Sequence, residues 1–177
     1  DTRSAQRTSV LNKDLLDALP TSRSVSSLGA IVPGVRLSKP DLGGTQAMQQ
    51  IYGSAHGMGD NENSINVDGM DVRPNTDTAS YQQYFNPGMT QEMTYQTGGV
   101  TADSELGGLR INVIPRDGGN QWSGEMFGQA SNKKLQASNL TPYLKSRGLP
   151  SPSEISSMWD LNPVVGGPIR RDRIWIV

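Results

Sequence analysis

Residues 64–72 read Ser-Ile-Asn-Val-Asp-Gly-Met-Asp-Val, and this stretch indicates the fold most directly. Polar and apolar residues alternate over 64–67, which is the period of a β-strand with one buried face. Asp68 and Gly69 follow, and an Asp-Gly pair favours a two-residue hairpin turn. A second strand fits residues 70–72, which include Asp71. The stretch therefore predicts a strand, a tight turn and a strand.

Two short helices are predicted upstream of this hairpin. The first has Asn12 as its N-cap and is stopped by Pro20, and its apolar residues fall at helical spacing: Leu11, Leu15, Leu16 and Leu19. The second covers residues 22–31 and ends before Pro33 and Gly34. Residues 36–63 are predicted to be a polar, Gly-rich loop with a short strand near 47–52.

Downstream of the hairpin, residues 73–88 are predicted to be a second polar loop. Residues 89–96 fit either a short helix or a strand, and the pattern alone leaves both open. Gly107 and Gly108 lie in a predicted turn at 105–108. Residues 109–114 are rich in β-branched side chains and predict a strand that Pro115 ends.

The last third of the chain has a different pattern. Residues 122–131 and 158–165 alternate between two faces, and a long polar stretch, 132–157, separates them. A short turn is predicted at 166–172, and a final strand at 173–177. The order strand, long loop, strand, short turn, strand is typical of transmembrane β-barrels, although an ordinary soluble hairpin has the same pattern. We expect Trp122, Trp159 and Trp175 to contribute to an aromatic girdle.

Composition indicates a thin core. Hydrophobic residues make up 34% of the 177 residues, and the mean hydropathy is −0.52. A net charge of −1 provides no basic footprint for nucleic acid, so we expect no nucleic-acid partner. The chain has no cysteine, which excludes disulfides and thiolate metal sites. It stops within an apolar run at 174–177, so we expect it to continue in a longer protein.

Five motifs occur along the chain in a known order. They are the pair Leu-Asp-Ala-Leu-Pro (16–20) and Leu-Gly-Ala-Ile-Val-Pro-Gly-Val (28–35); the hairpin at 65–72; Gly-Gly-Leu-Arg-Ile-Asn-Val-Ile-Pro-Arg-Asp-Gly-Gly-Asn (107–120); Gly-Glu-Met-Phe-Gly (124–128); and Gly-Gly-Pro-Ile-Arg-Arg-Asp-Arg-Ile-Trp (166–175). Together they resemble the plug domain and first barrel strands of TonB-dependent outer-membrane receptors. The fifth motif is typical of the large Oar-like receptors. Arg110 and the Pro115-Arg116 pair depart from the family pattern and mark a divergent subgroup.

The resemblance implies an α+β plug domain, a small mixed sheet with short helices, over residues 1–120. It implies that residues 121–177 are the first antiparallel strands of a transmembrane β-barrel. A barrel of about 22 strands has a lumen wide enough to need a plug, and a polar lumen accounts for the low apolar content. The implied localisation is the bacterial outer membrane. The implied partners are the rest of the barrel, outer-membrane lipid, TonB and an unknown extracellular ligand.

The function implied by the resemblance is uptake of a ligand through a plugged barrel. A non-transporting adhesion or scaffolding protein with the same fold stays open as the alternative. The TonB box that the family carries upstream of the plug is not in this sequence.

The candidate site residues belong to two groups. We expect ligand contacts from five residues of the two outward loops: Tyr52, His56, Tyr81, Tyr84 and Phe85. Packing of their side chains against the barrel wall is an equally good interpretation. Turn and lumen roles are expected for Asp68, Gly69, Asp71, Gly107 and Gly108.

The sequence predicts no enzyme, cofactor or metal site. His56 is the only histidine, which argues against a two-histidine metal site and a catalytic triad. The acidic residues at 60, 62, 68 and 71 do not have the spacing of a calcium-binding loop. The glycine pairs are not followed by Lys and Ser or Thr, which excludes a phosphate-binding loop of that type.

Overall fold

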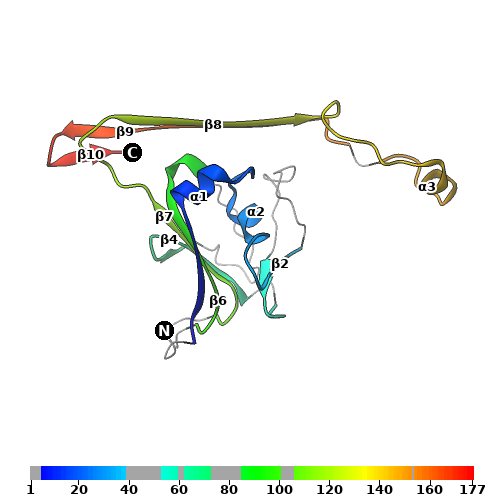
Figure 1. The fold of residues 1–177 in the computed structure, drawn as a ribbon, viewed down its shortest axis with the longest axis horizontal. Helices are drawn as coiled ribbons and strands as arrows, with labels where there is room; N and C mark the ends of the chain where they lie inside the picture. Colours follow the sequence, from blue (N-terminus) through cyan, green and yellow to red (C-terminus); the bar gives the residue numbers. More distant parts are fainter. Residues whose placement is uncertain (1–4, 39–52, 60–61, 73–84, 101–105, 153) are drawn as a thin grey trace.

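The computed structural model describes residues 5–38, 53–59, 62–72, 85–100, 106–152 and 154–177. Two parts follow one another along the chain (Figure 1). The N-terminal unit, residues 5–116, holds a five-stranded sheet and two helices. The C-terminal sheet has three strands and lies above this unit in Figure 1. The mixed α+β unit followed by antiparallel strands confirms the predicted fold class.

The five-stranded sheet has the order β1-β6-β7-β4-β5. Its strands are β1 (Arg7–Asn12), β4 (Ser64–Val67), β5 (Met70–Asp71), β6 (Thr90–Gly98) and β7 (Arg110–Pro115). The β4–β7 pair is parallel and the other three pairs are antiparallel, so the sheet is mixed. Residues 89–96, which the pattern left open, lie almost entirely in β6.

The hairpin predicted at residues 64–72 is formed by β4 and β5. Asp68 and Gly69 have φ values of 49° and 80°, the left-handed pair that a type I′ turn requires. Glycine and aspartate tolerate these angles better than bulky residues do. Asp68 N also donates to Val113 O at 2.9 Å, which ties the turn to β7.

Helices α1 (Lys13–Ala18) and α2 (Val25–Gly29) both have side-chain N-caps. The Asn12 side chain accepts a hydrogen bond from Leu15 N, as predicted, and Ser24 does the same for Ser27 N. The predicted start of the first helix is confirmed, because α1 begins directly after Asn12. Leu11, which the spacing grouped with this helix, belongs to β1 instead. Pairing of Leu11 with Met93 of β6 satisfies the backbone there, and this long-range pairing overrides the local helical spacing.

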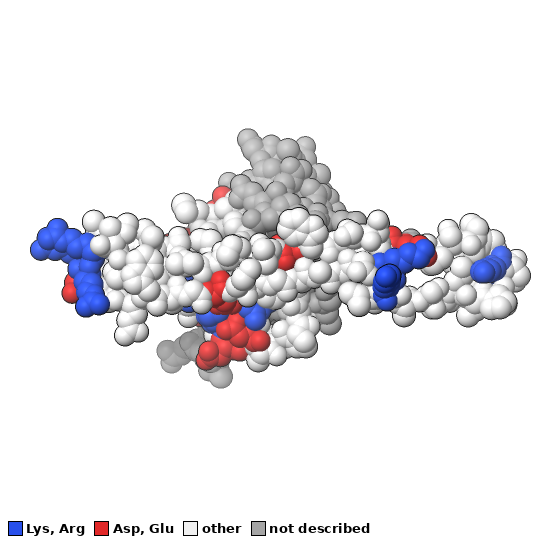
Figure 2. Space-filling model, turned by 90° about the horizontal axis from the view of Figure 1, so that it is seen from above, with Lys and Arg blue, Asp and Glu red and all other residues white. Residues whose placement is uncertain are grey.

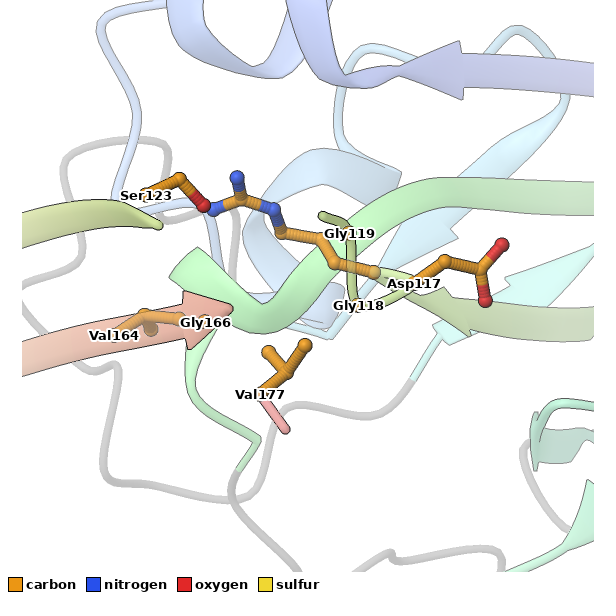
Figure 3. A pocket seen from close by; sticks show the side chains of 8 residues that line it. Asp117, Gly118, Gly119, Ser123, Val164, Gly166 and Val177 are labelled. Carbon is orange, nitrogen blue, oxygen red and sulfur yellow. The ribbon is translucent and has the colours of Figure 1, made fainter. Parts of the chain in front are cut away.

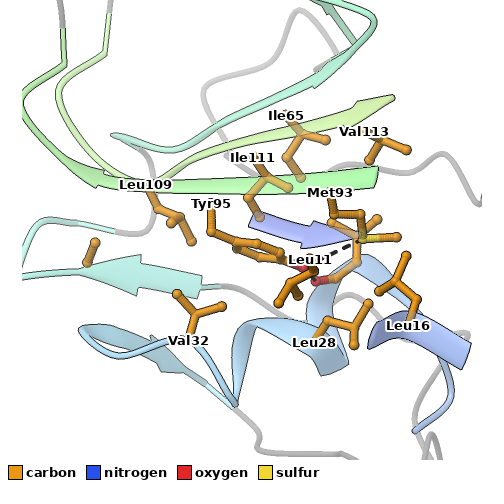
Figure 4. Close-up of a cluster of buried hydrophobic side chains, with 12 residues drawn as sticks. Leu11, Leu16, Leu28, Val32, Ile65, Met93, Tyr95, Leu109, Ile111 and Val113 are labelled. Carbon is orange, nitrogen blue, oxygen red and sulfur yellow. Dashed lines mark hydrogen bonds between the residues drawn. The ribbon is translucent and has the colours of Figure 1, made fainter. Parts of the chain in front are cut away.

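The core lies between one face of this sheet and the two helices (Figure 4). Tyr95 and Leu28 are fully buried, at 0% exposure each. The Tyr95 hydroxyl donates to Val25 O at 2.5 Å, so the one polar atom of this ring has a partner. The other buried apolar residues include Leu11, Leu16, Val32, Ile65, Met93, Leu109, Ile111 and Val113.

Shorter elements complete the N-terminal unit. Strands β2 (Val35–Leu37) and β3 (Gly53–Ala55) form a separate antiparallel pair. The 3-10 helix η2 (Pro87–Met89) leads into β6 and is capped by the Asn86 side chain. The strand predicted near residues 47–52 lies outside the described residues.

The C-terminal sheet has the order β10-β9-β8, with antiparallel pairing throughout. Strand β8 is Ser123–Asn132, β9 is Ser157–Arg170 and β10 is Ile174–Ile176. The long stretch between β8 and β9 contains the short helix α3 (Pro142–Ser146). The predicted turn at 166–172 was too wide. Strand β9 continues through Arg170 because β10 pairs with Gly167, Pro168 and Arg170, which leaves a turn at residues 171–173.

The two faces of this sheet differ in exposure, as the alternation predicts. Large apolar side chains on one face are open to the surroundings: Met126 is 69% exposed, Trp159 73% and Val165 62%. On the other face Glu125 and Phe127 are half-buried against the N-terminal unit. The indole N–H of Trp175 donates to Asn120 Oδ1 at 2.8 Å. Among the described residues, no helix is long and apolar enough to cross a membrane.

Candidate functional site

Glu125 joins the two parts of the molecule. It lies on β8, on the face toward the N-terminal unit, and its side chain is 23% exposed. Its carboxylate oxygens receive Lys13 Nζ at 2.6 Å, Arg23 Nη1 at 2.9 Å and Arg116 Nη1 at 3.3 Å. The three cations come from α1, from the loop before α2 and from the segment after β7. One carboxylate of the C-terminal sheet is thus held by three separate elements of the N-terminal unit.

Asp17 shares two of these cations. It lies 3.0 Å from Lys13 Nζ and 3.0 Å from Arg23 Nη1. The group, which we call the Glu125 cluster, therefore has three cations and two carboxylates: Lys13, Asp17, Arg23, Arg116 and Glu125. Four of the side chains are only 17–23% exposed, so water screens these charges less than it screens a surface ion pair.

Local structure explains why these side chains meet. Lys13 is the first residue of α1, whose start is set by the Asn12 cap. Arg23 has φ of 54°, and its N–H donates to Thr21 Oγ1 at 3.1 Å, which holds this bend between the helices. The bend directs the Arg23 guanidinium to 4.9 Å from the centre of the Phe127 ring, a cation–π distance.

Arg116 adds a second link to β8. Its backbone N–H donates to Met89 O at 2.7 Å, and Nη1 lies 3.3 Å from Gly88 O. These bonds hold the side chain at the end of η2 beside Glu125. In the sequence, Arg116 stands out only as a departure from the family pattern, and no local signal indicates this contact.

Helix η2 packs directly on β9. Asn86 Nδ2 donates to Pro163 O at 3.1 Å. A Cβ atom added at Gly88 would lie 2.8 Å from Val164 Cγ2, so only glycine fits without a shift. Val164 itself is 6% exposed, which shows that this is a closed contact and not a loose approach.

Asn120 ties the connection between β7 and β8 to the β9–β10 turn. Its Oδ1 accepts from Asp172 N at 2.9 Å and from Trp175 Nε1 at 2.8 Å, and its Nδ2 donates to Asp172 Oδ1 at 2.5 Å. Gly118 lies directly against Trp175, where a side chain would collide. The third and fifth sequence motifs are therefore in physical contact.

A small pocket of about 20 Å³ opens beside this connection (Figure 3). Its wall is formed by the linker glycines and the ends of β8, β9 and the chain: Arg116, Asp117, Gly118, Gly119, Ser123, Val164, Gly166 and Val177. A cavity of this size holds about one water molecule and is too small for an organic ligand.

The first 109 residues match the family model described as the TonB-dependent Receptor Plug Domain. The chain belongs to this family. Its members are receptors of the bacterial outer membrane, and that is where this protein resides. They are transporters and not enzymes. The resemblance that the five motifs indicated is thereby confirmed.

Solved receptors have the same fold across both parts of the chain. The siderophore receptor PirA from Acinetobacter baumannii is 20% identical over 93% of this chain, with a TM-score of 0.63. The ferric yersiniabactin uptake receptor FyuA from Yersinia pestis is 15% identical over 96%, with a TM-score of 0.58. A variant of the ferric enterobactin receptor PfeA from Pseudomonas aeruginosa is 19% identical over 96%, with a TM-score of 0.59.

These alignments cover only 22–23% of the three receptors' own chains. Comparison with curated protein sequences gave no match. The alignments reach past residue 109, where the plug match ends, into the C-terminal sheet, so β8, β9 and β10 fit the start of a barrel. The Glu125 cluster is then a contact between plug and barrel.

Two of the five ligand-contact candidates are described by the structure. His56 is exposed with φ of 52°, and its Cε1 would lie 3.3 Å from a Cβ added at Gly34. Phe85 is half-buried and packs against the core of the plug, which favours a packing role over direct ligand contact. Tyr52, Tyr81 and Tyr84 lie outside the described residues.

The predicted turn residues stabilise the sheet through backbone contacts. Gly69 N donates to Asn112 Oδ1 at 2.9 Å, which fixes the β4–β5 turn against β7. Asp71 pairs with Asn66 in the same hairpin. Gly108 N donates to Glu62 O at 3.0 Å, at an approach so close that a side chain would collide with Glu62. Gly107 lies beside Met58, with 3.4 Å between an added Cβ and Met58 Cε.

No metal centre emerges in the part of the chain that the structure describes, where no three His, Asp or Glu residues gather closely enough to hold an ion. The chemistry of the Glu125 cluster is therefore that of a docking contact. Its charges link the C-terminal sheet to the N-terminal unit.

Proposed function

We propose that this chain is the plug and the first barrel strands of an outer-membrane receptor that takes up an extracellular ligand through a plugged β-barrel. The plug would cover residues 1–120 and the barrel would begin at residue 121. Membership of the plug family supports the proposal. The observation that carries it is the Glu125 cluster, because it joins plug and barrel through polar contacts.

A plug that must move during transport needs an interface that can open. The Glu125 cluster and the Asn86–Pro163 hydrogen bond are polar, and most large apolar side chains of β8 and β9 face the other way. Val164 and Phe127 are apolar side chains on the plug side of these strands. Ion pairs and hydrogen bonds can exchange with water, whereas a large apolar interface loses about 25 cal/mol for every Å² that it exposes. A polar interface is therefore the kind that a pulling force can open and that re-forms afterwards.

In this proposal the ligand binds on the outward loops. Five residues remain the candidates for that contact: Tyr52, His56, Tyr81, Tyr84 and Phe85. Of these, Phe85 packs against the core of the plug. TonB would supply the force through a segment upstream of the plug. The three solved receptors take up or bind siderophores by their descriptions, but identities of 15–20% carry the fold and not the ligand.

The test uses the full-length receptor and a variant that lacks residues 1–120. In planar lipid bilayers we expect the intact receptor to conduct poorly and the deletion variant to form a large open pore. We also expect the periplasmic domain of TonB to bind the intact receptor. A closed barrel that shows no TonB binding would favour the non-transporting alternative. A full-length protein that is absent from the outer-membrane fraction would refute the barrel itself.

A further inference from the structure

The turn between β9 and β10 is strongly basic. Residues 170–173 read Arg-Arg-Asp-Arg, and all four are exposed. Figure 2 shows the basic side chains gathered at the end of the molecule where this turn lies. Across the described residues, no ion pair is recorded for the side chains of Arg170, Arg171 or Arg173.

The acidic residue of the turn does not neutralise these arginines. Asp172 Oδ1 accepts from Asn120 Nδ2 at 2.5 Å, and Asp172 N donates to Asn120 Oδ1 at 2.9 Å. Asn120 therefore holds Asp172 toward the plug linker. The turn has a net charge of +2, from three arginines and one aspartate.

Apolar residues flank the turn on both sides. Ile169 is 64% exposed and Ile174 is 52% exposed. Each is adjacent to an arginine in the sequence, and one strand residue advances only about 3.4 Å. If these isoleucines contact the hydrocarbon of a bilayer, the guanidinium groups lie at the level of the lipid headgroups.

The orientation of the barrel strands decides which leaflet this is. The turn at 171–173 is short and lies beside the plug linker, whereas the long stretch 133–156 with α3 extends from the other end of β8 and β9 (Figure 1). Outer-membrane barrels have short periplasmic turns and long extracellular loops. The basic turn then faces the periplasmic leaflet, which is made of phospholipid.

The geometry points to a binding site for anionic phospholipid headgroups, formed by Arg170, Arg171 and Arg173 at the periplasmic end of the β9–β10 hairpin. This inference rests on the proposed barrel, because the barrel places the turn at a membrane surface. Arginine donates two parallel hydrogen bonds to a phosphate group, and each basic residue near an anionic surface contributes about a fivefold factor to binding. Phosphatidylglycerol, which has a net negative charge, fits the site better than zwitterionic phosphatidylethanolamine.

The test measures lipid binding to the full-length receptor by native mass spectrometry. Delipidated receptor is titrated with phosphatidylglycerol or with phosphatidylethanolamine. The test variant replaces Arg170, Arg171 and Arg173 by Gln. The control variant removes the same charge from the opposite end of the strands, through Lys134→Gln, Lys145→Gln and Arg147→Gln; these three residues are exposed. Both variants are first checked for the heat-modifiable mobility of a folded barrel.

We expect the test variant to bind phosphatidylglycerol at least about tenfold more weakly and phosphatidylethanolamine with unchanged affinity. The control variant should keep the affinity of the unmodified receptor for both lipids. Equal weakening by the two variants, or no weakening by either, would overturn the proposal. If the triple variant does not fold, Arg171→Glu takes its place, with the same loss of selectivity expected. Inorganic phosphate at millimolar concentration should not displace the lipid; displacement would indicate a free-phosphate site instead.

A second measurement separates this inference from the proposed function. Arg171→Cys is introduced in the full-length receptor and treated with a membrane-impermeant maleimide on intact cells. We expect labelling only after the outer membrane is permeabilised. Labelling of intact cells would refute the periplasmic orientation. If the cysteine is labelled only after permeabilisation but the variant with Gln at 170, 171 and 173 keeps its lipid selectivity, the lipid site alone is refuted.

Discussion

Glu125 accepts a hydrogen bond from Lys13 Nζ at 2.6 Å, and these two residues are 112 positions apart in the sequence. Lys13 opens the first helix of the plug, and Glu125 lies in the first barrel strand. Arg23 and Arg116 reach the same carboxylate from two other elements. The start and the end of the plug chain are therefore anchored at one point of the barrel wall.

Replacing Glu125 by Gln should loosen the plug. The substitution keeps the shape but leaves Asp17 as the one carboxylate of the cluster, and Asp17 contacts Lys13 and Arg23 and not Arg116. Removing one partner from a partly buried charge network costs about 1–3 kcal/mol. We expect amide hydrogen exchange in α1 and α2 of the full-length receptor to become faster by about one to two orders of magnitude.

The matched control for this substitution is Glu154→Gln. Glu154 pairs with Lys133 at 2.6 Å, but both side chains are well exposed, at 43% and 68%. An exposed pair contributes about 0–1 kcal/mol, so exchange in the plug should not change. Equal exchange rates in the Glu125 variant and the unmodified receptor would show that the cluster does not hold the plug.

Replacing Asn120 by Ala should free the β9–β10 turn. The substitution removes the acceptor for Asp172 N and Trp175 Nε1 and the donor for Asp172 Oδ1. The Asp172 backbone has φ of 59°, which costs about 1 kcal/mol for a residue with a side chain, so it depends on this support. We expect a red shift in tryptophan fluorescence and a higher yield of unfolded barrel on heating.

Asn120→Asp provides a sharper version of that experiment. It keeps an oxygen that can accept from Trp175 Nε1 but places a second carboxylate next to Asp172. We expect the fluorescence to change less than in the Ala variant, while the stability falls by a similar amount. Asn132→Ala, at the exposed end of β8, serves as the control and should have neither effect.

Replacing Gly88 by Ala should push η2 away from β9. The added methyl group would lie 2.8 Å from Val164 Cγ2, which is closer than carbon atoms approach without strain. Overpacking of this kind costs about 1–3 kcal/mol, measured as a lower thermal midpoint of the full-length receptor. Combining Gly88→Ala with Val164→Ala removes the obstructing methyl groups, so the double variant should regain part of the loss.

Gly59→Ala is the control for the glycine substitution. An added Cβ at Gly59 meets no atom within 4 Å, and the midpoint should stay the same. If Gly88→Ala and Gly59→Ala behave alike, the close contact between η2 and β9 does not exist in the protein.

Replacing Tyr95 by Phe should destabilise the plug core slightly. The ring is fully buried, and its hydroxyl donates to Val25 O in α2, so the variant leaves a buried carbonyl without this donor. The expected cost is about 1–3 kcal/mol, seen as faster hydrogen exchange in α2. Tyr143→Phe changes the same group on an exposed ring of α3 and should leave exchange in the plug unaltered.

Local sequence determined much of this protein. The Asp68-Gly69 turn, the Asn12 cap and the alternation along β8 depend on residues one to four positions apart, where backbone geometry and side-chain period act directly. The order of the five motifs was enough to indicate the family.

Tertiary structure alone decided which of these elements meet. Strand β1 was missed because it is stabilised by β6, more than 80 positions away, and nothing in its own spacing marks it as a strand. Nothing in the neighbouring sequence indicates that Lys13, Arg23 and Arg116 contact the same carboxylate, that of Glu125. The pattern places Trp175 on a strand, but it does not indicate that the indole N–H bonds to Asn120. Periodicity specifies the direction of a side chain within its own element, whereas its partner depends on how the whole chain packs.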